Sequence, residues 1–263
     1  MKVDSMMPAV ISSAFMRAVR RPLVGLLLGL VLVATPAAFA SGGGGLHAAN
    51  ISLNNTGSLQ NGAKLYFNYC SGCHALNFMR YARIAEDLGL SEDQVTKNFM
   101  FTKAKFGETI HANINPRDAA EWFGKAPPDL SLEVRARGAD WVYTYLKSFY
   151  LDPSRPIGWN NTLFPNASMP NPLWELQGLQ TATFKPGQNG AEHAFEKFDL
   201  RQPGSETPAE FEETVRDLTA FLQYASEPAA LQRKSIGIWV LLYLGVFTFL
   251  AWMLKNEYWK DVH

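Results

Sequence analysis

The feature that most constrains this chain is the run Cys70-Ser71-Gly72-Cys73-His74, which contains both cysteines of the 263-residue sequence. Two thiols separated by two residues and followed at once by a histidine have the spacing of covalent haem c attachment. Each thiol reaches one vinyl group of the porphyrin, and the histidine supplies an axial nitrogen to the iron. The run therefore predicts one covalently bound haem c, with Cys70, Cys73 and His74 as cofactor-binding residues and His74 as an iron ligand.

The cysteine spacing by itself also occurs in redox dithiols and zinc half-sites. A redox dithiol is expected within a thioredoxin-like βαβ unit, and a zinc site needs a second pair of ligands. Neither pattern is visible in the sequence. A structural disulfide between Cys70 and Cys73 would close a very short, strained loop. The histidine that follows directly favours haem attachment.

The first 40 residues have the three parts of a secretory signal peptide. A positive region with three arginines precedes an apolar stretch at residues 23–33, and Ala38-Phe39-Ala40 is a small-residue cleavage sequence. The alternative is an uncleaved N-terminal membrane helix, because the apolar stretch is short but not impossibly so. Haem c is attached after export, so the signal and the cysteine motif support each other.

A second apolar stretch covers residues 236–254, nineteen residues without a charge. At the rise of an α-helix this length spans about 28 Å, which matches the hydrocarbon core of a bilayer. We therefore expect one transmembrane helix. Basic residues flank it on both sides, so the positive-inside rule gives no orientation. The export signal instead places the body outside the cytoplasm and residues 255–263 inside it.

These two segments define the expected organisation: a signal peptide at residues 1–40, a periplasmic haem c domain at 41–230, and an anchor at 231–263 with a short cytoplasmic tail. The protein should cross the inner membrane of a bacterium once, with the lipid bilayer as a partner. Beyond residue 40 the chain has 20 basic and 23 acidic residues, a net charge of about −3. This balance predicts no nucleic-acid partner.

The body is predicted to be mainly α-helical with long irregular loops, because strand patterns are sparse. Helical signals cover residues 58–70, a segment opened by Ser91 with Gln94 as its capping-box partner, residues 131–150, and a segment capped by Thr207 with Glu210. The first of these helices places Gly62 and Tyr66 on one face. Residues 152–206 are rich in Pro, Gly and Asn, and we expect them to be mostly irregular.

An iron held by His74 needs a second axial ligand if its task is electron transfer, because an open position would bind oxygen or other small molecules. The candidates beyond the signal region are Met79, Met100, Met169, Met253, His47, His111, His193 and His263. Most are unsuitable by position: they belong to the predicted membrane segment, lie too near His74, stand between core phenylalanines or occupy surface-type segments.

Met169 differs because it lies in the run Phe164-Pro165-Asn166-Ala167-Ser168-Met169-Pro170-Asn171-Pro172, which cannot be the interior of a helix or strand. Prolines fix the backbone on both sides, so this loop can present one side chain in a preset position. From the residues alone, Met169 is the leading candidate and His111 is the alternative.

Four motifs, in order along the chain, resemble those of the cytochrome c1 family. They are the run at 70–74, Ala126-Pro127-Pro128-Asp129-Leu130-Ser131 followed by Arg135-Ala136-Arg137, Phe164-Pro165 leading to Met169-Pro170, and Ala225-Ser226-Glu227-Pro228 before a single C-terminal membrane helix. The resemblance covers nearly the whole chain beyond the signal region. It implies a cytochrome c-type haem domain in the haem subunit of the quinol:cytochrome c reductase, complex III.

The resemblance implies Met169 as the sixth ligand, Arg137 as the partner of a haem propionate, and the Pro128 region as packing on the haem and accepting the proton of His74. A thioether opposite an imidazole favours ferrous iron and raises the potential. An arginine fork matches a carboxylate, and a carbonyl on the far imidazole nitrogen fixes the ring. The alternative for Arg137, and the favoured interpretation of Arg135, is a solvated helical face.

This chain departs from its relatives at two points. Some members have an extra disulfide before the methionine loop, which is residues 164–172 in this chain. No cysteine remains here to form that disulfide, so prolines and packing must stiffen the loop. Trp141 stands where relatives often have a tyrosine near a propionate, so the hydrogen bond of that tyrosine hydroxyl is not expected here.

The resemblance implies a membrane-anchored carrier that accepts single electrons from a Rieske iron–sulfur protein and reduces a soluble or membrane-tethered cytochrome c. Quinol oxidation would occur on a cytochrome b partner, which makes this chain the electron-transfer subunit of an oxidoreductase, with no catalytic residue of its own. One alternative is the haem c subunit of a terminal oxidase, which the context of Arg137 and Met169 disfavours. Another is a haem-based sensor with an open sixth position.

Overall fold

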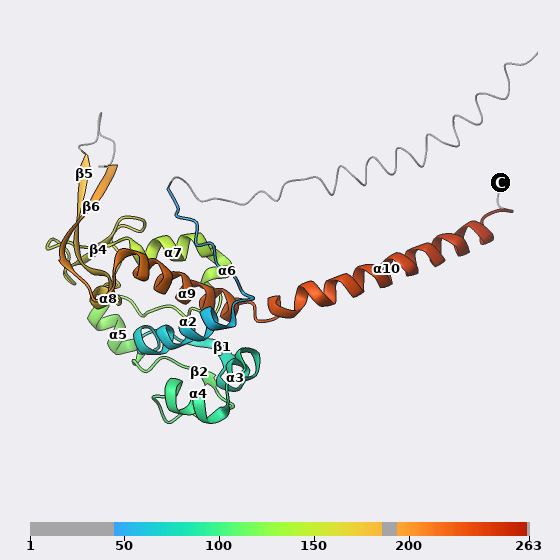
Figure 1. The fold of residues 1–263 in the computed structure, drawn as a ribbon, viewed down its shortest axis with the longest axis horizontal. Coiled ribbons are helices and arrows are strands. Elements are labelled where there is room, and N and C mark those ends of the chain that lie inside the picture. Colours follow the sequence, from blue (N-terminus) through green and yellow to red (C-terminus); the bar gives the residue numbers. More distant parts are fainter. Residues whose placement is uncertain (1–44, 186–193, 262–263) are drawn as a thin grey trace, which may run out of the picture. The chain divides into compact units, whose positions relative to one another are not determined.

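The computed structural model describes residues 45–185 and 194–261, and the predicted signal peptide at residues 1–40 lies outside them. Most of the regular structure in this part of the chain is helical, as predicted. The helices are α2 (Thr56–Tyr69), α3 (Tyr81–Leu88), α4 (Glu92–Phe99), α5 (Pro116–Phe123), α6 (Glu133–Arg137), α7 (Ala139–Lys147), α8 (Trp174–Gln177), α9 (Pro208–Ser226) and α10 (Ala230–Tyr258) (Figure 1).

Two long helices from distant parts of the sequence, α2 and α9, pack side by side (Figure 1). Gly62 makes this close approach possible, because a Cβ at this position would collide with the carbonyl oxygen of Asp217 and lie 2.7 Å from Cβ of Phe221. Tyr66 lies on the same face of α2, and its ring centroid is 5.7 Å from that of Phe221. The predicted shared face of Gly62 and Tyr66 is therefore confirmed, and it is the face that meets α9.

Both predicted capping boxes are present. At the start of α4, the Ser91 side chain accepts from the Gln94 amide at 3.2 Å, and the Gln94 side chain accepts from the Ser91 amide at 2.8 Å. At the start of α9, Thr207 and Glu210 form the same reciprocal pair, with a proline in the first turn. These bonds satisfy amides that have no partner within the helix.

Residues 131–150 differ from the single helical segment that the sequence suggests. Gly138 separates α6 from α7, with a φ of 91°, a conformation that glycine adopts at little cost. The segment then leaves the helix after Lys147 and continues into strand β3 (Phe149–Leu151). The turn at Gly138 lets Arg137 and Trp141 approach each other from two different helices.

The expectation that residues 152–206 are mostly irregular is wrong for a long hairpin. Strands β5 (Gly178–Lys185) and β6 (Ala194–Pro203) pair antiparallel, and the register shifts twice along the ladder. Two shorter antiparallel pairs join β1 (Leu76–Arg80) to β2 (Thr109–Ile110) and β3 (Phe149–Leu151) to β4 (Trp159–Asn161). The register shifts interrupt the alternation of apolar and polar residues, which is why the hairpin was hidden in the sequence.

Aromatic side chains hold the C-terminal half of α2 in the core. Phe67 stacks on Phe99 of α4 with ring centroids 4.7 Å apart and on Tyr81 of α3 at 5.7 Å. Tyr66 is fully buried between Phe67 and α9. Burial of each such ring stabilises the fold by about 1.5–3 kcal/mol. The packing fixes the end of α2, which Cys70 follows directly.

Helix α10 contains the predicted membrane span. Its segment Ser235–Tyr258 has a mean hydropathy of 2.1 with no residue buried, and it includes the predicted residues 236–254. A helix of 24 residues is about 36 Å long, enough to cross a bilayer with some tilt. Among the described residues it is the one helix that is both long and apolar enough to do so.

Candidate haem site

The cysteine motif forms a tight turn at the C-terminal end of α2. The amides of Cys73 and His74 both donate to the carbonyl oxygen of Cys70, at 3.0 and 2.8 Å. The hydroxyl of Tyr66 donates to the carbonyl oxygen of His74 at 2.7 Å, and this bond ties the end of the turn back to the buried face of the helix. The turn is therefore held by the core and not only by its own backbone.

The two thiols are unpaired, Cys70 buried and Cys73 half-buried. Burial, with a smaller contribution from Cys73, raises the pKa of the Cys70 thiol to about 12. A redox dithiol needs the opposite environment, one that lowers the thiol pKa and stabilises the thiolate. The environment of Cys70 therefore argues against a redox dithiol, which was one alternative interpretation of the motif.

His74 is buried, and its Nδ1 lies 2.8 Å from the carbonyl oxygen of Pro128. A carbonyl oxygen can only accept, so Nδ1 carries the proton and donates, and Nε2 keeps its lone pair. Burial lowers the pKa of the imidazole, and the bond to Pro128 opposes this shift. The result is a neutral, oriented ring with a free Nε2, which is the form of histidine that binds metals. The residues present therefore fit a haem iron.

Three hydrogen bonds hold Pro128 next to His74. The amide of Leu130 donates to the carbonyl oxygen of Ala75 at 2.9 Å, and the Asp129 side chain accepts from the amide of Asn77 at 2.9 Å. The hydroxyl of Ser131 accepts from the next amide, that of Phe78, at 3.1 Å. The segment Asp129-Leu130-Ser131 thus runs along the residues that follow His74 and sets the position of the Pro128 carbonyl.

Met169 lies half-buried in the loop between β4 and α8. The hydroxyl of Tyr145, on α7, donates to its Sδ at 3.7 Å. Burial raises the pKa of Tyr145 to about 12, while the charge of Arg137 opposes the shift, so the hydroxyl stays protonated and able to donate. The sequence did not single out Tyr145, since its contact with Met169 depends on the tertiary fold.

Asparagine side chains anchor the methionine loop at both ends. The amide group of Asn161 donates to the carbonyl oxygen of Tyr145 at 2.9 Å, and its oxygen accepts from the amides of Leu163 and Phe164 at 2.9 and 3.0 Å. At the other end, the oxygen of Asn171 accepts from the amide of Leu173 at 2.9 Å. Both asparagines are buried. Side-chain amides therefore hold the loop in place, in addition to the stiffening that its prolines and packing are expected to give.

Arg137 lies beside the methionine loop with partners on two sides. Its guanidinium forms an ion pair with Glu133 one turn earlier and lies 4.3 Å from the centre of the Trp141 ring and 5.6 Å from that of Phe164. Trp141 in turn stacks on Tyr145, with ring centroids 5.0 Å apart. Arg135, on the same helix, is exposed. Trp141 thus supports the guanidinium through its ring face.

The structure brings the predicted residues into two groups. One contains the cysteine motif, His74 and Pro128; the other contains Arg137 and Met169, joined through Trp141 and Tyr145. Glu133 links the groups, because its charge raises the pKa of His74 against the effect of burial and it also pairs with Arg137. The chain itself also connects the groups, because the segment Asp129-Leu130-Ser131 beside His74 leads directly into α6, the helix of Glu133 and Arg137.

The other candidate ligands occupy different settings. Both ring nitrogens of His111 have side-chain partners, Nδ1 with Asn77 at 2.7 Å and Nε2 with Thr109 at 3.1 Å, and the residue is exposed. Met79 is fully buried, and Met100 packs against the core. The remaining candidates are His47, exposed; Met253, in α10; and His193 and His263, outside the described residues.

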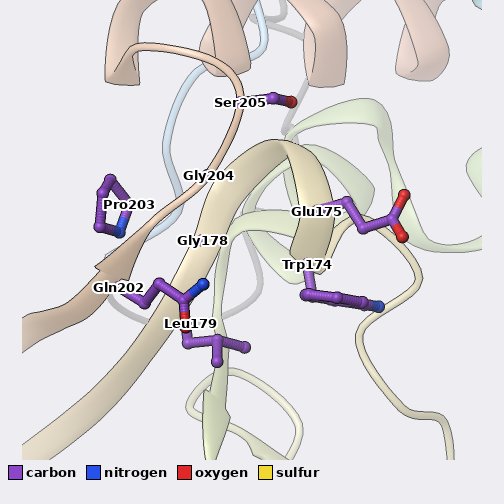
Figure 2. Close-up of a pocket in the computed structure, with 8 residues that line it drawn as sticks. All are labelled: Trp174, Glu175, Gly178, Leu179, Gln202, Pro203, Gly204 and Ser205. Carbon is purple, nitrogen blue, oxygen red and sulfur yellow. The ribbon is translucent and has the colours of Figure 1, made fainter.

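A small surface pocket contains no predicted site residue. Figure 2 shows it between α8 and the paired ends of β5 and β6, with the Trp174 side chain at one side. Three backbone segments crowd there, since a Cβ at Gly178 would come within 2.6 Å of the amide nitrogen of Gly204. The pocket is therefore a feature of the hairpin base and not of the haem site.

Comparisons with known proteins agree with the geometry. The model of the Cytochrome C1 family matches residues 47–262. Cytochrome c1 of Allochromatium vinosum is 49% identical over 241 residues, which cover 90% of this chain and 99% of that protein. A protein of Nitrosomonas europaea named ammonia monooxygenase gamma subunit is 42% identical over 83% of this chain and 89% of its own length. A protein of Bradyrhizobium diazoefficiens named cytochrome b/c1 is 27% identical over 79% of this chain but only 34% of its own length.

Proposed function

Because the chain belongs to the cytochrome c1 family, we propose that it is the membrane-anchored haem c subunit of a quinol:cytochrome c reductase, complex III. The observation that carries the proposal is the pairing of His74 with Pro128, which leaves Nε2 free and oriented directly after two cysteines with haem c spacing. In this role Cys70 and Cys73 hold one covalent haem c by thioether bonds.

A haem c, when bound, supplies one-electron redox chemistry at its iron. In the proposed site His74 ligates through Nε2, and the Pro128 carbonyl keeps this nitrogen available by holding the proton at Nδ1. Met169 would supply the second ligand to the iron from a loop that Asn161 and Asn171 keep in place. With an imidazole and a thioether as its ligands the iron would have no position free for oxygen, and the thioether would favour the ferrous state.

Arg137 is proposed to bind a haem propionate. Glu133 and Trp141 orient its guanidinium, and 41% of the Arg137 side chain is exposed, so these contacts do not enclose it. A positive charge near the iron also disfavours the ferric form relative to the ferrous form. The residue would therefore contribute to binding and to the potential together.

The proposed partners follow from the family. Electrons arrive from a Rieske iron–sulfur subunit and leave to a soluble or membrane-tethered cytochrome c, while quinol is oxidised on a cytochrome b subunit. The relative named cytochrome b/c1 supports an association with cytochrome b, because its name joins the two proteins and this chain covers only about a third of its length. Helix α10 is proposed to anchor the chain in the inner membrane, with the haem domain in the periplasm and the C-terminus in the cytoplasm.

Purification of the tagged full-length chain from its native membranes tests this function. We expect a cytochrome b and a Rieske protein to co-purify, and the haem of the preparation to be reduced by added quinol. Co-purification with the catalytic subunits of a terminal oxidase or of ammonia monooxygenase instead would contradict the assignment. A preparation that contains the chain alone and whose ferrous form binds carbon monoxide would favour a sensor.

A further inference from the structure

We propose that Tyr145 is a positioning residue for the thioether of Met169, holding Sδ in one orientation and raising the midpoint potential of the bound haem. The inference rests on the proposed function, in which Met169 is the sixth ligand. It adds a residue that acts on the iron through another side chain and is separate from the cysteine motif.

The hydroxyl of Tyr145 has a fixed position. Its ring stacks on Trp141 with planes 10° apart and meets the edge of Phe149, with centroids 5.0 Å apart in both pairs. These contacts prevent the ring from swinging away from Met169. The oxygen then lies 3.7 Å from Sδ, a suitable distance for a sulfur acceptor because sulfur is larger than oxygen.

The backbone of Tyr145 is tied to the same loop. Its carbonyl oxygen accepts from the Asn161 side chain, whose own oxygen accepts from the amides of Leu163 and Phe164. Tyr145 therefore contacts the beginning of the methionine loop through its backbone and Met169 itself through its hydroxyl. The bond through Asn161 and the bond from the hydroxyl together set the distance from the Tyr145 oxygen to the Met169 sulfur. The conformation of the loop is therefore not the sole determinant of this distance.

The chemistry of the site explains why a hydroxyl is present at this position. A phenylalanine would fill the same space between Trp141 and Phe149, whereas a buried phenol needs a partner for its proton. Within the described residues that partner is Sδ of Met169. Phenylalanine would therefore satisfy packing, and the hydroxyl has its use at the sulfur.

A thioether sulfur has two lone pairs, so it can bind a metal with one and accept a hydrogen bond with the other. The hydrogen bond draws electron density from the sulfur and weakens its donation to the electron-poor ferric iron. Hydrogen bonds to ligands are one of the means by which a protein adjusts haem potential. A shift of about threefold in the ratio of ferrous to ferric protein corresponds to ~30 mV for a one-electron couple.

The test compares Tyr145→Phe with the parent as the full-length haem protein in its membrane. Tyr143→Phe is the matched control, because Tyr143 is buried on the same helix and its hydroxyl accepts from Lys147 at 3.3 Å. Redox titration measures the potential, the weak far-red band of the ferric protein reports the Met–iron bond, and added imidazole competes with Met169 for the iron.

We expect Tyr145→Phe to lower the midpoint potential, which corresponds to a decrease of about threefold in the ferrous-to-ferric ratio at a fixed solution potential. The variant should also shift the far-red band and bind imidazole more readily. The control Tyr143→Phe should behave like the parent. If the two variants change equally, or if Tyr145→Phe keeps the parent potential and band, the inference is wrong although Met169 remains the ligand. If the parent itself lacks the far-red band, it is the proposed ligation by Met169 that fails. These results distinguish the two proposals.

Discussion

Replacing Gly62 by alanine should destabilise the protein by about 2 kcal/mol, because it forces α2 and α9 apart. The new Cβ would collide with the carbonyl oxygen of Asp217 and lie 2.7 Å from Cβ of Phe221, and neither a helix backbone nor a Cβ can move alone. Overpacking of this kind costs up to about 3 kcal/mol, and the better helix propensity of alanine returns about 1 kcal/mol. For a domain of this size the net loss lowers the midpoint of thermal unfolding by roughly 4–8 °C.

The assay is thermal and urea unfolding of the haem-containing protein in detergent, followed by circular dichroism and by haem absorbance. Gly57→Ala is the matched control, because Gly57 is an exposed glycine of the same helix whose added Cβ would lie 3.5 Å from Oδ1 of Asn55, an ordinary contact. We expect this control to be neutral or stabilising by up to about 1 kcal/mol. If Gly62→Ala is as stable as Gly57→Ala, the close packing of α2 on α9 does not hold the fold in the way described.

Two further changes test the cofactor attachment and the anchor. Replacing Cys70 and Cys73 together by serine should leave a haem that acid acetone extracts completely, and a haem-stained band that persists on a denaturing gel would rule out thioether attachment through this motif. Ending the chain after Arg233 should release a soluble, haem-containing body. The truncated body retains Leu231, which packs on its core, and loses the apolar segment Ser235–Tyr258. A truncated protein that stays in the membrane after signal cleavage would show that another segment anchors it.

The local parts of the fold could be predicted because their signals depend on near neighbours in the sequence. A capping box needs only two residues three positions apart, so Ser91 with Gln94 and Thr207 with Glu210 were recognisable. The break at Gly138 was missed because glycine within an apolar helical pattern does not by itself show that the backbone turns there. The β5–β6 hairpin was missed because its register shifts disturb the alternation on which strand prediction relies.

The candidate site was likewise predictable only where its signals come from neighbouring residues in the sequence. The motif at residues 70–74 could be found because its residues are contiguous, and the bond from His74 to Pro128 was an expectation from the family and not from spacing. The roles of Met169 and Arg137 stay predictions. The contact between Tyr145 and Met169 could not be foreseen, because it depends on Asn161 joining α7 to a loop. The asparagines that suggested irregular structure prove to be the anchors of that loop. The available signal was the residue type itself, because asparagine side chains commonly bond to nearby backbone groups.

The most direct test of the central account is the addition of carbon monoxide to the reduced parent protein and to Met169→Leu, which keeps the volume of the side chain but removes the sulfur. The account predicts that the spectrum of the parent does not change, since Met169 and His74 occupy both axial positions. The variant should keep its covalent haem, bind carbon monoxide and show a lowered midpoint potential. A parent protein that binds carbon monoxide, or a variant that refuses it and keeps the parent potential, would contradict the assignment of Met169 and make His111 the next candidate.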